Sequence, residues 1–171
     1  QRADYPFAQF GLGRIAASRG NTAQAVAILR PLAARLPLPE FLVALGDLYT
    51  RQKNARAAQE QYDLVRLIQQ LNAAAGMDVD LELAAFDVQY SADGEAALAA
   101  ARAAYAARPT IYAADALAWA LHRRGDSTAA WPYMQEALRL GTRDPLLHLH
   151  AAAIADRLGD AAAAEIHWGQ A

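Results

Sequence analysis

The chain has 171 residues, no cysteine and a formal net charge of −2. That length accommodates one domain with a core, or several small stacked units. The lack of cysteine excludes disulfides and thiolate metal sites, and it fits reducing and oxidising compartments equally. The near-neutral charge, without a basic block, disfavours nucleic-acid binding. No apolar run approaches the roughly 18 residues that a membrane-spanning helix needs, and the abundance of alanine favours helix.

The segment FGLGRIA near the start of the chain contains a motif that suggests an enzyme. It places Gly11, Gly13 and Ala16 at the spacing of a dinucleotide-binding fingerprint. That fingerprint needs a β-strand directly before it and an acidic residue about 20 residues after it. The preceding segment is short and contains Pro6, and the downstream segment LRPLAARLP has no carboxylate. We therefore expect no nucleotide cofactor, and we interpret Gly13 as a small residue at a helix contact, repeated as Gly46.

Signals of a helix start recur along the whole chain. An Asn or Asp is followed four residues later by Ala at five places, with intervals of 33, 39, 33 and 34 residues. Such residues cap the free N–H groups of a helix start, and a glycine just before them permits a tight turn between two helices. Prolines stand between units, where they prevent a helix from continuing. Each unit is therefore predicted to be a helix, a turn and a second helix. The five caps are Asn21, Asn54, Asp93, Asp126 and Asp160.

This pattern resembles the tetratricopeptide repeat (TPR), a unit of about 34 residues with Leu-Gly on the first helix, Gly-Asp or Gly-Asn at the turn and Ala early in the second helix. The segment 111–144 matches best, with Leu117, Ala118, Gly125, Asp126 and Ala130 in place. The resemblance covers nearly the whole chain. It implies an all-α fold, a right-handed helical-hairpin solenoid that forms one domain over residues 1–171. The five repeats are expected at roughly 6–38, 39–77, 78–110, 111–144 and 145–171.

The sequence departs from the repeat pattern in several places. Lys53 takes the place of the turn glycine in the second repeat, whose second helix is predicted to continue until Gly76 ends it. Ala84 and Ala85 replace Leu-Gly in the third repeat. The last repeat is incomplete and the chain begins at Gln1, so we expect a fragment of a longer array.

The ionisable residues form no familiar catalytic or metal-binding pattern. His148 and His150 are two residues apart, so on one helix they point in different directions and do not share a metal. Neither an H-E-x-x-H nor a G-x-S-x-G motif occurs. These histidines, with His122 and His167, are expected on the surface or in a groove. We expect no enzyme activity, no cofactor and no metal site.

The resemblance implies that partner-binding side chains lie on the first helix of each repeat, which lines a concave face. In this chain those positions hold aromatic rings, arginines and carboxylates, a combination typical of protein-binding hot spots. The Lys and Asn of family members that grip a C-terminal carboxylate are missing. In the alternative interpretation some of these rings, above all those of Phe86 and Trp119, pack between repeats. The expected partner-binding residues are Phe10, Arg14, Asp47, Phe86, Tyr90, Tyr112, Asp115, Trp119, His122 and Arg123.

These features favour a non-enzymatic module that binds a peptide or a segment of a partner protein in the concave groove. The alternative is an architectural segment of a larger assembly, such as a spacer or an arm that associates end to end with further copies. Neither nucleic-acid binding nor membrane insertion by this segment is expected.

Overall fold

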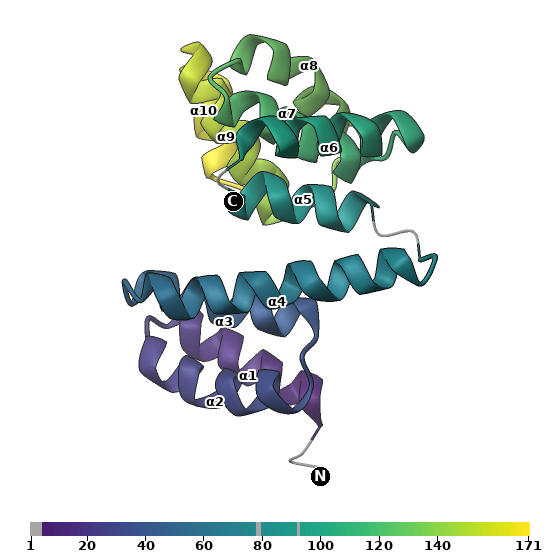
Figure 1. Cartoon of the computed structure of the whole chain (residues 1–171). Coiled ribbons are helices and arrows are strands. Elements are labelled where there is room, and N and C mark those ends of the chain that lie inside the picture. The colour runs from purple at the N-terminus through teal and green to yellow at the C-terminus, as the bar shows by residue number, and fades with distance from the viewer. Residues whose placement is uncertain (1–4, 78–79, 92) are drawn as a thin grey trace. The chain divides into compact units, whose positions relative to one another are not determined.

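The computed structural model describes residues 5–77, 80–91 and 93–171, without the side chains of Asp80 and Glu82. These residues form ten helices joined by short turns, and each odd-numbered helix packs against the even-numbered helix that follows it (Figure 1). The prediction of an all-α fold with about five helical hairpins is therefore confirmed. The helices are α1 (Pro6–Ser18), α2 (Thr22–Arg35), α3 (Pro39–Arg51), α4 (Ala55–Ala74), α5 (Asp80–Tyr90), α6 (Gly94–Ala107), α7 (Ile111–Arg123), α8 (Ser127–Leu138), α9 (Pro145–Leu158) and α10 (Ala161–Trp168).

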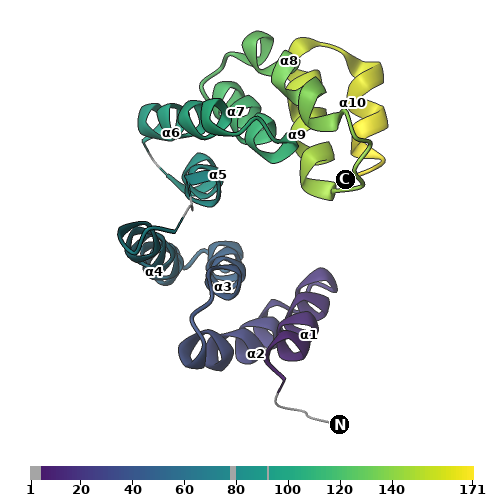
Figure 2. The ribbon, with the colours of Figure 1, turned by 90° about the vertical axis from the view of Figure 1, so that its right-hand side faces the viewer.

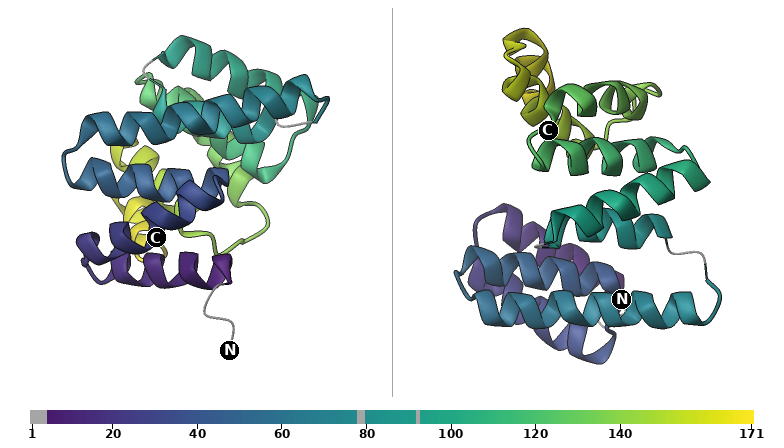
Figure 3. Two further views of the ribbon diagram at one scale, coloured as in Figure 1. Left: turned by 60° about the horizontal axis from the view of Figure 1, so that its bottom comes forward. Right: turned by 45° about the horizontal axis from the view of Figure 1, so that its top comes forward.

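The chain divides into two compact units, residues 1–77 and residues 78–171. Unit 1 holds α1 to α4, of which the 20-residue α4 is the longest helix (Figure 3). Unit 2 holds α5 to α10. In unit 2 the first helices α5, α7 and α9 lie side by side, and α6 and α8 each pack between their own first helix and the next one (Figure 2). Among the described residues of unit 2, one face of the α5, α7 and α9 layer is therefore left without a covering helix.

The predicted caps start the second helix of every hairpin. Each of the five side chains accepts a hydrogen bond from a backbone N–H two or three residues further on. Because the first N–H groups of a helix have no partner within the helix, these bonds fix where the second helix begins. The prediction is confirmed at Asn21, Asn54, Asp93, Asp126 and Asp160.

The turns between paired helices need a left-handed backbone. Gly20, Gly125 and Gly159 have φ angles of 77°, 88° and 80°, as the sequence predicted for turn glycines. Lys53 adopts the same conformation with φ of 58°, although a side chain disfavours it. Gly76, with φ of 81°, follows the end of α4 and confirms the predicted stop.

The small residues of the first helices allow the paired helices to approach closely. A Cβ atom at Gly13 would lie 2.5 Å from Cδ2 of Leu29, and one at Gly46 would lie 2.4 Å from Cε1 of Tyr62. Ala118 is fully buried at the matching place in the fourth repeat. Gly13 lies inside α1, where its N–H belongs to the helix, so the structure supports the helix-contact interpretation of the FGLGRIA motif.

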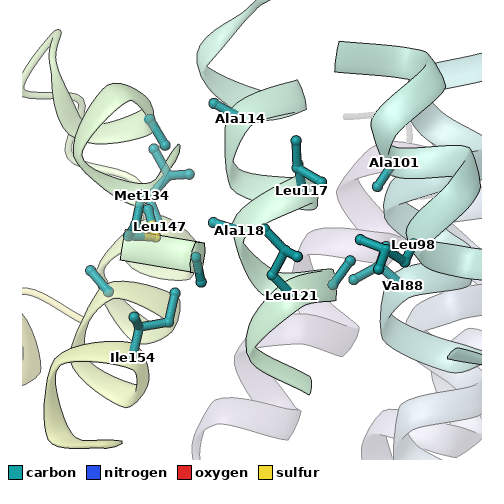
Figure 4. Close-up of a cluster of buried hydrophobic side chains, with 14 of the residues drawn as sticks. Val88, Leu98, Ala101, Ala114, Leu117, Ala118, Leu121, Met134, Leu147 and Ile154 are labelled. Carbon is teal, nitrogen blue, oxygen red and sulfur yellow. The ribbon is translucent and has the colours of Figure 1, made fainter. Parts of the chain in front are cut away.

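The core of unit 2 is centred on α7, in which nine of 13 residues are buried. Leu117 and Leu121 of α7 extend toward Val88 and Leu98, while Met134 and Ile154 belong to the same cluster from α8 and α9 (Figure 4). Ile111 and several alanines of α7 complete the cluster. Since α7 is packed from two sides through these residues, the position of its uncovered face is fixed by the core.

Two glycines of α1 offer a matched test of helix packing. Gly13→Ala should destabilise unit 1 by about 1–3 kcal/mol, because Leu29 must move to make room. Gly11→Ala should stabilise it by about 0.5–1 kcal/mol, because no atom lies within 4 Å of the added methyl group and alanine is the better helix former. Urea unfolding of the two variants measures both effects. Equal shifts of the same sign would contradict the packing argument.

The backbone of Lys53 offers a second test. Lys53→Gly should raise the free energy of unfolding by about 0.5–1 kcal/mol, because it removes the penalty of a side chain in the left-handed region. Lys53→Ala is the control, since alanine pays the same penalty and should leave the stability close to that of the wild type. A loss of stability in the glycine variant, measured by urea unfolding, would show that the Lys53 side chain matters more than its backbone.

Candidate functional site

The uncovered face of unit 2 brings seven of the ten predicted partner-binding residues onto neighbouring helices. Helix α7 contributes Tyr112, Asp115, Trp119, His122 and Arg123, whose spacing of three, four, three and one places them on one side of the helix. Helix α5 contributes Phe86 and Tyr90, and Gln89 and His150 join them from α5 and α9.

Trp119 is held in a fixed orientation at the centre of this group. Its indole Nε1–H donates a hydrogen bond to Gln89 Oε1 at 2.9 Å. Its ring stacks on the imidazole of His150, with centroids 4.1 Å apart and planes 11° apart, and on that of His122 at 4.9 Å and 16°. The indole is partly buried. A large, amphipathic ring with few orientations left to lose is well suited to a binding surface.

The buried pair of Asp115 and His150 supports the stacked rings of Trp119 and His150. His150 Nδ1 lies 2.9 Å from Asp115 Oδ1, and His150 and Asp115 are only 4% and 7% exposed respectively. The carboxylate can only accept, so Nδ1 carries the proton and donates it. His150 Nε2 is buried and has no hydrogen-bond partner. Asp115 therefore acts on the surface indirectly, by fixing the imidazole on which Trp119 rests.

His122 forms a separate pair with Ser127. His122 Nδ1 lies 2.9 Å from Ser127 Oγ. Burial lowers the pKa of His122, and the electrostatic influence of His150 and Arg157 lowers it further. Asp115 pairs with the imidazole of His150, whereas Ser127 pairs with that of His122. Aspartate, histidine and serine are therefore not joined in the single hydrogen-bonded chain that activates a serine nucleophile, and Ser127 is itself buried.

Arg123 contacts its own chain. Its guanidinium Nη1 donates to the backbone oxygen of Val88, and to that of Gln89 at 3.0 Å. These carbonyls lie in the last turn of α5, where a positive charge is favourable. Arg123 thereby links the end of α5 to α7 and helps to place Gln89 beside Trp119.

The aromatic residues of this face differ in how much they expose. Phe86 is buried, and its ring centroid lies 4.9 Å from that of Tyr90, which is half-buried. Tyr112 is 49% exposed at the start of α7. Tyr112 and the open part of Trp119 are therefore the aromatic groups of α7 that an incoming molecule can contact.

The other three predicted residues lie in unit 1. Phe10 packs on Phe41 at 4.7 Å between centroids, and the Arg14 guanidinium lies 5.9 Å from the centre of the Phe10 ring. Asp47 accepts a hydrogen bond of 2.9 Å from the Tyr62 hydroxyl. Burial raises the pKa of Tyr62 to about 12, with the hydrogen bond to Thr50 acting against this rise and Asp47 adding to it. Arg14 and Asp47 also line one open pocket.

His148 and His150, predicted to lie on the surface or in a groove, are 7% and 4% exposed and are therefore not surface residues. They lie on opposite sides of α9, because His150 bonds to Asp115 while His148 Nδ1 lies 3.0 Å from Nδ1 of His167 on α10. As predicted, they do not face a common point. No group of three or more potential metal ligands occurs among residues 5–77, 80–91 and 93–171.

Sequence reasoning places Gln89 on the ligand-facing side of its helix but pairs neither Gln89 nor His150 with the Trp119 group. Their partners lie 30 and 35 residues away in the sequence, about one repeat apart. The repeat spacing could have indicated both contacts, because residues about one repeat apart on successive first helices become neighbours when those helices pack side by side. Within the part of the chain that the structure describes, no helix combines the length and apolar character that a membrane crossing needs.

Comparison with solved structures gives matches over nearly the whole chain. TTC0263, a thermophilic TPR protein of Thermus thermophilus, matches with a TM-score of 0.61 and 16% identity over 97% of this chain and 89% of that one. The fold is that of TPR proteins. PilW, a type IV pilus biogenesis factor, matches with a TM-score of 0.60 and 16% identity over 96% and 75% of the two chains. PilF of Pseudomonas aeruginosa matches with a TM-score of 0.55 and 20% identity over 96% and 74%.

No family model and no curated protein sequence matches the chain. At these identities the solved structures establish the TPR fold and nothing about partners. The candidate site must therefore be judged on its own residues.

His122, one of the two histidines stacked on Trp119, gives a pH-dependent prediction. Folding lowers the pKa of His122, so the unfolded state takes up the proton at a higher pH than the folded state does. The free energy of unfolding should therefore fall as the pH drops below about 6.5, and His122→Gln should remove part of this fall. Urea unfolding between neutral and mildly acidic pH measures it. An NMR titration that places the His122 pKa at or above the ordinary value would contradict the assignment.

Proposed function

We propose that the chain is a non-enzymatic scaffold that binds a segment of a partner protein on the open face of α5, α7 and α9 in unit 2. The observation that carries this proposal is the fixed Trp119 indole, held by Gln89 and stacked on two imidazoles. The exposed Tyr112 ring lies on the same helix, about two turns before Trp119. Binding energy at protein interfaces is concentrated in a few such aromatic anchors.

The chemistry of the face favours binding over catalysis. Its ionisable groups are engaged in internal contacts, because Asp115 bonds to His150, His122 bonds to Ser127 and Arg123 bonds to the end of α5. These bonds hold the ionisable side chains in place, and the aromatic rings of Tyr112 and Trp119 remain accessible on the face. The TPR fold supports the same interpretation, since repeat solenoids present extended surfaces to their ligands.

Peptides selected from a random phage-displayed library against the intact chain provide the probe. Tyr112→Ala should weaken the binding of selected peptides by about tenfold or more, which corresponds to about 1.4 kcal/mol, because it removes an exposed ring without opening the core. Trp168→Ala on α10 is the matched control, since its ring is 51% exposed against 49% for Tyr112. Isothermal titration calorimetry measures the affinities.

A second variant tests the stack itself. Gln89→Ala should weaken the same peptides without unfolding the chain, because it frees the Trp119 indole to reorient. Circular dichroism checks that each variant is folded. Unchanged affinity in both Tyr112→Ala and Gln89→Ala, or equal losses in Trp168→Ala, would refute the assignment of this face.

A further inference from the structure

A pair of histidines inside the α9–α10 hairpin is separate from the Trp119 face. His148 of α9 and His167 of α10 approach each other through their Nδ1 atoms, which lie 3.0 Å apart. The two helices pack side by side (Figure 1), and the ring planes are 27° apart with their centroids 5.3 Å apart. His148 is buried and His167 is half-buried. The contact is therefore formed entirely within one hairpin of unit 2.

The two Nδ1 atoms share one proton in this contact. When both imidazoles are neutral, one Nδ1 carries a proton and donates it, while the other accepts through its lone pair. If the donor ring carries its proton on Nε2 instead, both Nδ1 lone pairs become available at the same place. A metal ion can then take the position of the shared proton, since neutral imidazole is a common ligand of transition metals.

The separation of the two Nδ1 atoms agrees with that of two ligands on a single metal ion. With metal–nitrogen bonds of about 2.05 Å, two nitrogen ligands lie about 2.9 Å apart in neighbouring positions of a square-planar ion and about 3.3 Å apart on a tetrahedral one. The observed 3.0 Å falls between these values. Because each imidazole is carried by its own packed helix, only small side-chain rotations are needed to direct both lone pairs at an ion.

The surroundings of the pair indicate a site with open coordination positions. A cavity of about 460 Å³ borders His148 and is also lined by Gly141, Arg143 and Gln170. It leaves room for water molecules as further ligands. Among the described residues no third histidine, cysteine or carboxylate completes a metal-binding group, and the positive charge of Arg143 opposes a cation. Both facts favour an exchangeable ion over the closed, four-ligand type of structural zinc site.

We propose that His148 and His167 bind a divalent transition-metal ion, such as Zn²⁺ or Cu²⁺, that joins α10 to α9. Imidazole nitrogen selects these ions over Mg²⁺ and Ca²⁺, which prefer oxygen ligands. The two histidines are 19 residues apart in the sequence, so no short motif signals the pair. The proposal is independent of the partner site, because His150 of that site lies on the opposite side of α9.

Zinc titration of the intact chain, prepared without a histidine tag, tests the site. Isothermal titration calorimetry should show one Zn²⁺ ion bound per chain and no binding of Mg²⁺. His167→Gln should weaken zinc binding by about tenfold or more, since even residues that only orient a metal ligand contribute that much. Glu165→Gln is the matched control, because it removes an exposed carboxylate two residues away on the same helix and should leave the affinity unchanged.

Copper reports the ligands directly. Electron paramagnetic resonance of the chain with one equivalent of Cu²⁺ should show coupling to two imidazole nitrogens, and His148→Gln and His167→Gln should each lose one of them. Circular dichroism checks that both variants are folded, and the half-buried position of His167 makes its variant the safer one. A wild type that binds no zinc, or an affinity that is unchanged in both histidine variants, would overturn the proposal. So would an equal loss in Glu165→Gln and His167→Gln, which would assign the ion to surface charge.

Discussion

The close approach of the two helices in each hairpin is the constraint on which the other features depend. At Gly13 and Gly46 the second helix places Leu29 and Tyr62 where a methyl group would otherwise lie. This contact uses one side of the first helix completely. In unit 2 the neighbouring first helices lie along the flanking sides of α7, so one further side of α7 remains uncovered among the described residues of that unit. Substituting a large residue at Ala118, the matching buried position of α7, would therefore disturb the helix that carries the Trp119 face as well as weaken its hairpin.

The Trp119 group shows how that remaining side becomes rigid. Stacked imidazoles alone would leave the indole free to slide, whereas the bond to Gln89 sets its rotation. The imidazole beneath it is in turn oriented by Asp115, although His150 Nε2 is left without a partner. An unsatisfied buried group of this kind costs about 1–3 kcal/mol. A leucine at position 150 would avoid that cost, but it would not offer the Trp119 indole a flat ring to stack on. The Asp115–His150 pair therefore serves to orient the indole.

The hairpins could be predicted because the signals that form them are local. The site could not be predicted in the same way, because its contacts join residues that are far apart in the sequence. A cap such as Asp126 or a turn glycine such as Gly125 acts within a few residues, so its effect can be inferred from the adjacent sequence. The contact between Trp119 and Gln89 depends on how two repeats stack, and Arg123 turned out to bind the end of α5. The burial of His148 and His150 was missed for the same reason, because α9 is covered on one side by α7 and on another by α10.

The formal charge of −2 also conceals an uneven distribution of charge between the two units, which matters for the proposed function. Unit 1 contains nine basic and five acidic residues, whereas unit 2 contains seven basic and thirteen acidic ones. Charges of this kind guide approach and orientation more than they add affinity, and salt screens them. A partner that reaches the Trp119 face enters the field of the acidic unit, so a segment with basic residues beside an apolar anchor would approach it fastest.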